Sequence, residues 1–224
     1  KVIVTTEPAF ANLELAVEAP TGMTMGSATT FTERGVHQIK VQPNRGGHAM
    51  GKVLNYEFAV HEGLMTHSCL TSPPTEPYTG TKDIPLVDGV LGSENYRDGN
   101  WVGYFNPDYF SGHFGWDQPY AIDSIKINFL QSRLSWILIP EKVITDVYES
   151  EDQISRYEWD RTSSTSEEGI FIETMVLAPE GGFPATQNID LMIPNTEVLP
   201  DNHPSAGERV WHFLDEVQIY GRPL

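Results

Sequence analysis

Short runs of alternating apolar and polar residues recur along the whole chain, and each is bounded by Gly, Pro, Asn or Asp. A period of two is typical of a β-strand with one buried face, whereas a helical period is hard to find anywhere in the sequence. The 19 Gly and 16 Pro residues suit the many turns that such strands need. The sequence therefore predicts an all-β protein.

The spacing of these runs predicts two modules in the 224 residues. Residues 1–60 hold four short strand patterns, enough for a small immunoglobulin-like or fibronectin-like accessory domain. Residues 61–82 form a linker and first strand region, because residues 71–82 contain three prolines and no apolar period. Residues 83–224 carry longer strand patterns that favour an antiparallel jelly roll. These patterns fall at 110–116, 121–130, 136–140, 142–148, 170–177, 188–193 and 211–220, and the polar run 162–168 is predicted to be a solvated turn.

Charge and cysteine content narrow the possible partners. The chain has 14 Lys and Arg against 31 Asp and Glu, a formal charge of -17, which repels nucleic-acid phosphates and anionic lipids. We expect neither nucleic-acid binding nor membrane insertion, since no stretch approaches the length of a membrane span. The single cysteine, Cys69, cannot form an intramolecular disulfide. The start lacks the apolar core of a signal peptide, as expected of a mature form or an excised piece.

Two stretches at the ends of the second module are more specific than periodicity. The first, residues 86–104, resembles the opening loop of discoidin-like (F5/8 type C) domains, which include family 32 carbohydrate-binding modules. The second, residues 198–219, is similar to the tail of the same domains. The version most similar to both follows the catalytic barrel of bacterial family 20 β-N-acetylhexosaminidases. The matching positions of the first stretch are Leu86, Asp88, Gly89, Tyr96, Asp98, Gly99 and Trp101.

This resemblance implies a galactose-binding-like sandwich that binds carbohydrate of the galactose, GalNAc or GlcNAc type. It also implies a secreted, periplasmic or cell-surface protein, accessory to a glycan-degrading enzyme whose catalytic domain would lie in the parent chain. Two alternatives stay open: a structural domain that braces a glycoside hydrolase, and a protein-binding adhesion module.

Catalysis by this chain is not expected. Family 20 enzymes use an adjacent Asp-Glu pair, but here Asp215 and Glu216 lie in a predicted terminal strand, and the chain has no βα alternation for a barrel. No nucleophile, zinc or phosphate-binding motif is present in the sequence.

One structural calcium ion is implied by the resemblance, with Asp88 and Glu216 as ligands and backbone carbonyls near Ser93 or Arg97 completing the shell. The alternative is that Asp88 only caps a turn.

A sugar site requires an aromatic face and polar side chains that can bind hydroxyl groups. Several candidates also have structural explanations: Arg97 and Asp98 could form an exposed ion pair, Arg133 could neutralise a carboxylate, and His203 could fix a loop. Trp101, Trp136 and Trp211 are expected in the core. In family 32 modules the sugar site lies at the loop end of the sandwich, and by position the resemblance implies as ligand-binding candidates Tyr96, Arg97, Asn100, His113, Trp116, Arg133, Asn202 and His203.

Overall fold

The computed structural model of the chain describes residues 2–3, 14–19, 22–25, 28–29, 31, 33–45, 48–49, 52–80, 86–105, 109–162 and 169–224. The chain divides into two compact units, Lys1–Val60 and His61–Leu224. The predicted solvated turn falls largely on residues 163–168, which lie outside the described residues. Within the described part of the chain, no helix has both the length and the apolar character needed to cross a membrane.

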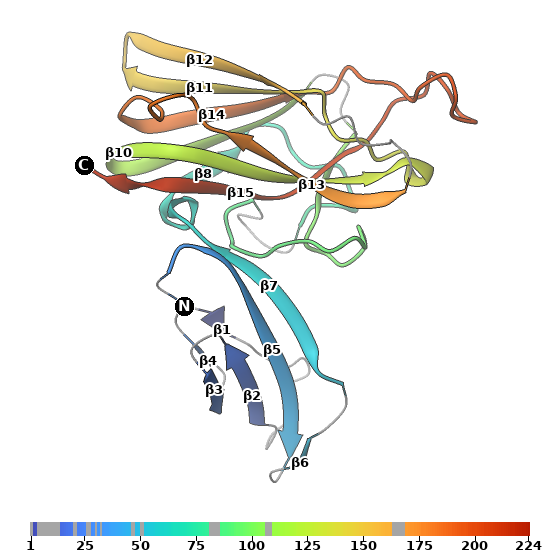
Figure 1. The fold of residues 1–224 in the computed structure, drawn as a ribbon. Helices are drawn as coiled ribbons and strands as arrows, with labels where there is room; N and C mark the ends of the chain where they lie inside the picture. The colour runs from blue at the N-terminus through green and yellow to red at the C-terminus, as the bar shows by residue number, and fades with distance from the viewer. Residues whose placement is uncertain are drawn as a thin grey trace. The chain divides into compact units, whose positions relative to one another are not determined.

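The regular elements described in the first unit are β-strands (Figure 1). A two-stranded pair is formed by β1 (Val2–Ile3) and β4 (Ala28–Thr29). The other strands form an antiparallel sheet in which β2 pairs with β3 and β5, and β5 also pairs with β6 and β7. Their bounds are Glu14–Ala19 for β2, Gly22–Met25 for β3, Gly35–Arg45 for β5, His48–Ala49 for β6 and Leu54–Val60 for β7. An immunoglobulin-like or fibronectin-like topology stays a prediction.

The second unit is built around one long strand, β10 (Tyr109–Ser132), which belongs to two layers (Figure 1). Its first part pairs with β14 on one side and β8 on the other, and β14 continues through β11 to β12. Its second part pairs with β13 and β15, and β15 continues to β9. The other bounds are His67–Leu70 for β8, Val102–Tyr104 for β9, Lys142–Ser150 for β11, Gln153–Asp160 for β12, Ile170–Leu177 for β13, Thr186–Pro194 for β14 and His212–Pro223 for β15.

The change of layer occurs near Pro119, in the middle of β10. The register with β14 shifts between Gly115 and Tyr120, and pairing with β15 begins at Tyr120. Proline has no N–H to donate to a neighbouring strand, so a sheet is easily interrupted there. Two predicted strands, 110–116 and 121–130, are therefore one bent strand.

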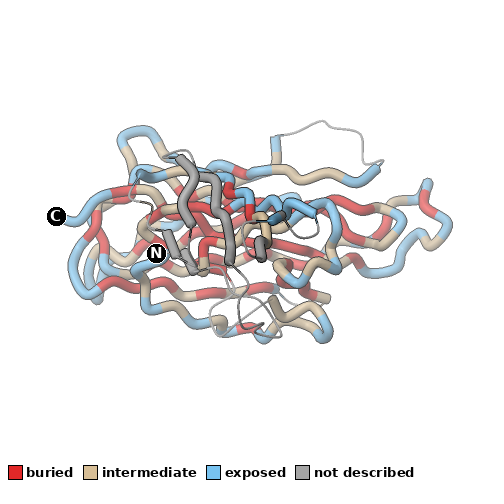
Figure 2. Tube along the Cα trace, turned by 90° about the horizontal axis from the view of Figure 1, so that it is seen from below, coloured by how far each residue is buried: buried red, intermediate tan, exposed pale blue. Residues whose placement is uncertain are grey.

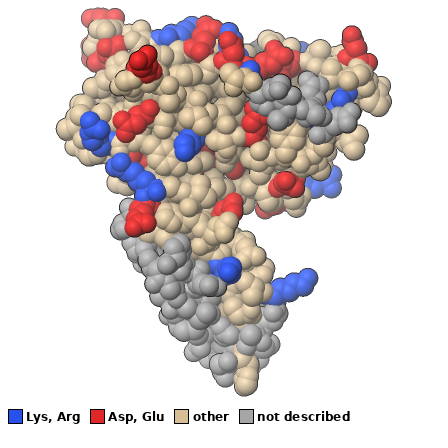
Figure 3. All heavy atoms as spheres, in the orientation of Figure 1, with Lys and Arg blue, Asp and Glu red and all other residues tan. Residues whose placement is uncertain are grey.

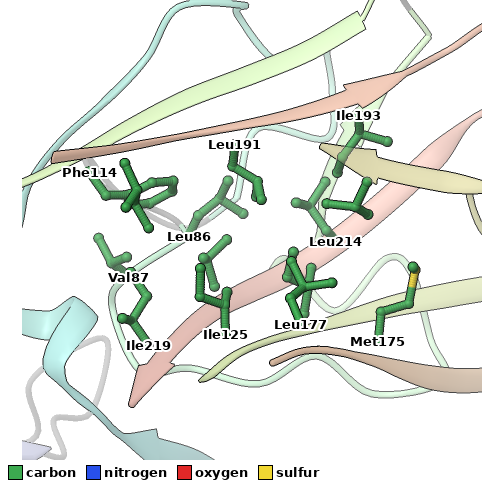
Figure 4. Close-up of a cluster of buried hydrophobic side chains, with 14 of the residues drawn as sticks. Leu86, Val87, Phe114, Ile125, Met175, Leu177, Leu191, Ile193, Leu214 and Ile219 are labelled. Atoms are coloured by element: carbon green, nitrogen blue, oxygen red, sulfur yellow. The ribbon is translucent and has the colours of Figure 1, made fainter. Parts of the chain in front are cut away.

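The apolar faces of the two layers meet in one core. Figure 4 shows Phe114 and Leu191 from the first layer beside Ile125 and Leu214 from the second. Buried positions (red) lie along much of the trace of this unit in Figure 2, and exposed positions (pale blue) are common toward its ends. On β14 and β11 buried and partly exposed residues alternate, as the period of two requires.

The all-β prediction and the antiparallel pairing are confirmed. The strand predicted at 136–140 is wrong: a 3₁₀ turn, η2 (Arg133–Ser135), precedes it, and Trp136 has a φ of 62°. A left-handed residue bends the chain, so Ile137 forms only isolated bridges. The sequence reasoning did not predict β9 or β12. Residues 61–80 contribute η1 (Glu62–Met65) and β8 to the second unit.

Candidate functional site

The loop of residues 86–101 is held by its own polar side chains. Oδ2 of Asp98 accepts hydrogen bonds from N and Oγ of Ser93, both at 2.7 Å, and its Oδ1 accepts one from N of Asn100 at 2.9 Å. Nδ2 of Asn100 donates to the carbonyl of Leu91 at 3.1 Å. Positive φ angles at Gly89 and Gly99 allow the turns. Asp98 is thus fixed within the loop and does not pair with Arg97.

The buried indole of Trp101 packs against this loop and is hydrogen-bonded to it. Its Nε1 donates to the carbonyl of Ser93 at 2.8 Å, and its side chain is 1% exposed. Gly92 lies so close that a Cβ there would be 2.3 Å from the indole. The expectation that Trp101 belongs to the core is confirmed.

Tyr78, which precedes the 86–101 loop in sequence, also packs against this loop. The backbone of Thr75 and Tyr78 exchanges hydrogen bonds with Gly103 of β9, which carries this segment along the edge of the second layer. The ring of Tyr78 meets that of Tyr96 edge to face, with centroids 5.8 Å apart. Sequence reasoning missed Tyr78 because its proline-rich surroundings predicted an exposed linker.

Together these segments form a pocket of about 410 Å³. Two of the predicted ligand residues, Tyr96 and Arg97, line it, and the guanidinium of Arg97 lies 5.1 Å above the ring of Tyr96. The pocket therefore combines aromatic surface with a positively charged group that donates hydrogen bonds. Its lining residues are Pro77, Tyr78, Thr79, Gly80, Tyr96, Arg97, Gly99 and Trp101.

The other predicted ligand residues do not line this pocket. Nη2 of Arg133 donates to Oδ1 of Asn202, so these two form a pair between loops. His203 is 8% exposed, and its Nδ1 accepts a hydrogen bond from N of Ser205 at 3.0 Å. Asn100 uses its side chain within its own loop, as described above.

Two further candidates lie on β10. Trp116 is 6% exposed and belongs to the hydrophobic core, where its ring stacks on Tyr120 at 5.2 Å. Nδ1 of His113 lies 2.6 Å from Oδ1 of Asp190, whose Oδ2 accepts a hydrogen bond from the hydroxyl of Tyr148 at 2.5 Å. The structure thus gives Trp116 a packing role and His113 a place in a network across three strands.

Asp215 and Glu216 are both 0% exposed on β15. Burial raises the pKa of Asp215 to about 7, although the N–H of Gly92, donating to its Oδ2 at 2.8 Å, opposes the rise. Burial, and then the nearby charge of Asp88, raise the pKa of Glu216 well above its usual value. Oε1 of Glu216 accepts from N of Gly89 at 2.9 Å and lies 2.7 Å from Nε2 of His61.

Oε2 of Glu216 is buried and has no hydrogen-bond partner in the described part of the chain. A carboxylate oxygen in that state fits either a proton or a cation between Glu216 and Asp88. Among the described residues, no group of three or more His, Cys, Asp or Glu side chains could hold a metal ion. Any cation here would need backbone carbonyls as further ligands.

A second pocket of about 390 Å³ is lined by residues of the turn between β11 and β12 and of the segment that enters β14. Its polar groups include Tyr148, Glu151 and Asn188, and no Lys or Arg lines it. Acidic side chains are also visible over the β11 and β12 side of the unit in Figure 3.

No protein-family model matches the chain, and neither does any curated protein. Among solved structures, a fucolectin from striped bass (Morone saxatilis) serum is 13% identical, with a TM-score of 0.42, over 72% of this chain and 48% of that one. A fucose-binding module of Streptococcus pneumoniae is 15% identical, with a TM-score of 0.44, over 72% and 97%. A family 32 module from a family 31 glycoside hydrolase of Clostridium perfringens is 12% identical, with a TM-score of 0.42, over 72% and 94%.

Proposed function

We propose that the second unit is a non-catalytic carbohydrate-binding module whose glycan lies in the pocket of Tyr78, Tyr96 and Arg97. The observation that supports this is the pocket itself, which has a volume of about 410 Å³ and is lined by aromatic rings and a guanidinium. Ligand pockets have volumes of roughly 300–1,000 Å³, so one or two sugar rings fit.

The chemistry of the lining suits a sugar. Pyranose rings present C–H groups on one face, which pack on aromatic side chains, and hydroxyl groups at their edges. Pro77 and Tyr78, whose ring meets that of Tyr96 edge to face, supply apolar surface. Arg97 supplies hydrogen-bond donors for sugar oxygens. A shallow, wet site of this kind gives weak binding, with a Kd between about 1 μM and 1 mM.

The acidic pair argues against a hydrolytic role. Substrate would have to reach both carboxylates of Asp215 and Glu216, yet both are 0% exposed. Their hydrogen bonds to Gly92 and Gly89 instead join the last strand to the loop that carries the pocket. We assign the pair a role in positioning that loop.

A structural calcium ion between Asp88 and Glu216 is part of the proposal. The unpartnered buried Oε2 of Glu216, close to a second carboxylate, fits a hard cation that takes oxygen ligands. The ion would supply positive charge beside the loop and take no part in sugar chemistry. The test is thermal unfolding with calcium or with EDTA, comparing the parent protein with Glu216→Gln.

Calcium should raise the Tm of the parent protein and leave that of Glu216→Gln unchanged. Equal melting of the parent protein in calcium and in EDTA would show that the buried carboxyl is simply protonated.

By the same proposal the chain is secreted, periplasmic or exposed at a cell surface, where glycans are met, and belongs with a glycan-degrading enzyme such as a family 20 hexosaminidase. Fractionation of the producing cells, followed by detection of the full-length protein, tests this. A cytoplasmic protein with no linked enzyme domain would contradict it.

The binding proposal is tested with a glycan array of the purified chain and titration of the best glycan. Tyr78→Ala and Arg97→Ala should each weaken binding at least tenfold, since each removes a wall of the pocket. Arg222→Ala is the matched control, because Arg222 is exposed and far from the pocket. On β15, Leu214 pairs with Val102 beside pocket residue Trp101, and Arg222 lies eight residues farther on, about 26 Å along the strand.

The alternatives predict different results. A blank array together with a folded protein would favour the bracing role or the adhesion role. Loss of binding in Arg133→Ala but not in Arg97→Ala would move the site to the loop pair of Arg133 and Asn202.

A further inference from the structure

Arg97 differs from Arg156 and Arg161, the two arginines of this unit that form ion pairs among the described residues. Arg156 donates to both oxygens of Asp146, at 2.8 and 2.6 Å, and Arg161 donates to both oxygens of Glu173, at 3.1 and 2.8 Å. Within the described residues, the side chain of Arg97 makes no ion pair and no hydrogen bond, and contacts the ring of Tyr96. Among the described residues these N–H donors have no acceptor, which leaves them to a ligand.

The nearest acidic neighbour in sequence cannot take these donors. Asp98 already accepts three hydrogen bonds, two from Ser93 and one from Asn100, and so faces into the loop. Among the described residues that line the pocket, Arg97 carries the only charged side chain. The loop holds Arg97 at the pocket, where no described carboxylate neutralises it.

The contact between Arg97 and the ring of Tyr96 also bears on which ligand the pocket can bind. The guanidinium carbon of Arg97 lies 5.1 Å from the centroid of the Tyr96 ring, and a guanidinium presents its N–H groups in its own plane as a fork. A planar carboxylate matches that edge with two parallel hydrogen bonds, whereas a sugar hydroxyl matches it with one. A sugar that carries a carboxylate therefore uses the donors of Arg97 more fully than a neutral sugar does.

We propose that this pocket selects acidic glycans, in which a sugar ring packs against the aromatic lining and its carboxylate pairs with Arg97. The inference rests on the proposed carbohydrate-binding function and specifies its ligand class. The charge of -17 disfavours extended polyanions, but a single carboxylate meets mainly its nearest groups, because charges farther away than about 8 Å are largely screened at physiological salt, and none of the described lining residues is acidic.

Matched sugar pairs test the selection. Galacturonic acid and galactose, and glucuronic acid and glucose, differ only in a carboxylate against a hydroxymethyl group, so titration of each pair isolates the carboxylate. At least one acid should bind about tenfold more tightly than its neutral partner, and added NaCl should reduce this preference. Arg97→Gln should remove the preference, and Arg97→Lys should keep part of it because the charge remains without the planar fork.

The outcomes separate this inference from the binding function. If neutral sugars bind as tightly as the acids, or if Arg97→Gln keeps the preference, the selection for acids is wrong while carbohydrate binding stands. If galactose 6-sulfate binds more tightly than both acids, the assignment to a carboxylate is wrong. If no sugar of any class binds to the folded protein, both proposals fail. Arg222→Gln, which removes one exposed charge outside the pocket, should leave every affinity unchanged.

Discussion

His61 donates a hydrogen bond from Nε2 to Oε1 of Glu216 across 155 positions of sequence, with both side chains fully buried. The direction follows from the other ring nitrogen, because Nδ1 accepts from the backbone N–H of Gly63 and of Ile219, at 3.1 and 3.2 Å. Nε2 therefore carries the proton. Burial lowers the pKa of His61 to about 4, in keeping with a neutral ring. One imidazole thus joins the start of the second unit to its last strand.

Replacing His61 by Ala should lower the free energy of unfolding by about 2–4 kcal/mol, because buried donors and a buried carboxyl oxygen lose their partner. Urea unfolding at pH 7 measures this. His67→Ala is the matched control: His67 also faces a carboxylate, Asp117 at 2.9 Å, but both side chains are largely exposed. That variant should change stability by less than about 0.5 kcal/mol. Equal losses in the two variants would refute a special role for His61.

Gly92→Ala should destabilise the loop that carries the pocket by about 1–3 kcal/mol, since the new Cβ would overlap the indole of Trp101. Denaturant unfolding gives the loss, and tryptophan fluorescence reports any displacement of the ring. Gly207→Ala provides the comparison, because its Cβ would contact nothing, although a φ of +83° adds strain of about 1 kcal/mol. An unchanged spectrum and stability in Gly92→Ala would contradict the close packing.

His212 should contribute a loss of stability as the pH is lowered from about 6.5 to 4, while Asp215 and Glu216, whose pKa values are raised by burial, contribute in the opposite direction. Burial lowers the pKa of His212 to about 4, while the hydrogen bond from its Nδ1 to the carbonyl of Leu138 opposes the shift. Between the two pKa values the unfolded chain binds a proton that the folded chain does not, so protonation favours unfolding. The full stabilisation is present above the unfolded pKa and amounts to about 3 kcal/mol at most.

The measurement is urea unfolding of the parent protein and of His212→Gln at pH 7.5, 5.5 and 4.5. The free energy of unfolding of the parent protein minus that of the variant should fall as the pH is lowered, because Asp215 and Glu216 titrate in both proteins and cancel in the difference. Nε2 of His212 lies 3.9 Å from Oε1 of Glu197, so Glu197→Gln belongs in the same series. Parallel pH profiles for the parent protein and His212→Gln would show that His212 does not contribute.

Arg161→Lys should cost about 1 kcal/mol or slightly more, because lysine cannot form the two parallel hydrogen bonds to Glu173. Arg161 directly follows β12 of the first layer and Glu173 lies on β13 of the second, so this partly buried pair links the two layers. The corresponding change at Arg156, which is 57% exposed, should cost less than about 0.5 kcal/mol. Chemical denaturation of both variants tests the ranking, and the reverse order would contradict it.

The loop of residues 86–101 shows what could be predicted. Tyr96 and Arg97 are neighbours in sequence and lie together at the pocket, since a short loop fixed by Asp98 keeps them together. Tyr78 could not be placed in advance, because its position depends on backbone pairing with Gly103. Trp116 illustrates the opposite case, since one step along a strand moves a side chain from a surface to the core.

By itself, the sequence determined the all-β class, the acidic surface and the chemistry of the loop before Trp101, because these depend on local periodicity, composition and neighbouring residues. Only the tertiary structure decided that β10 serves both layers, that His61 meets Glu216, and that no described carboxylate pairs with Arg97 while Arg133 pairs with Asn202. These relationships depend on strand register and on contacts between residues far apart in sequence, which no local pattern encodes.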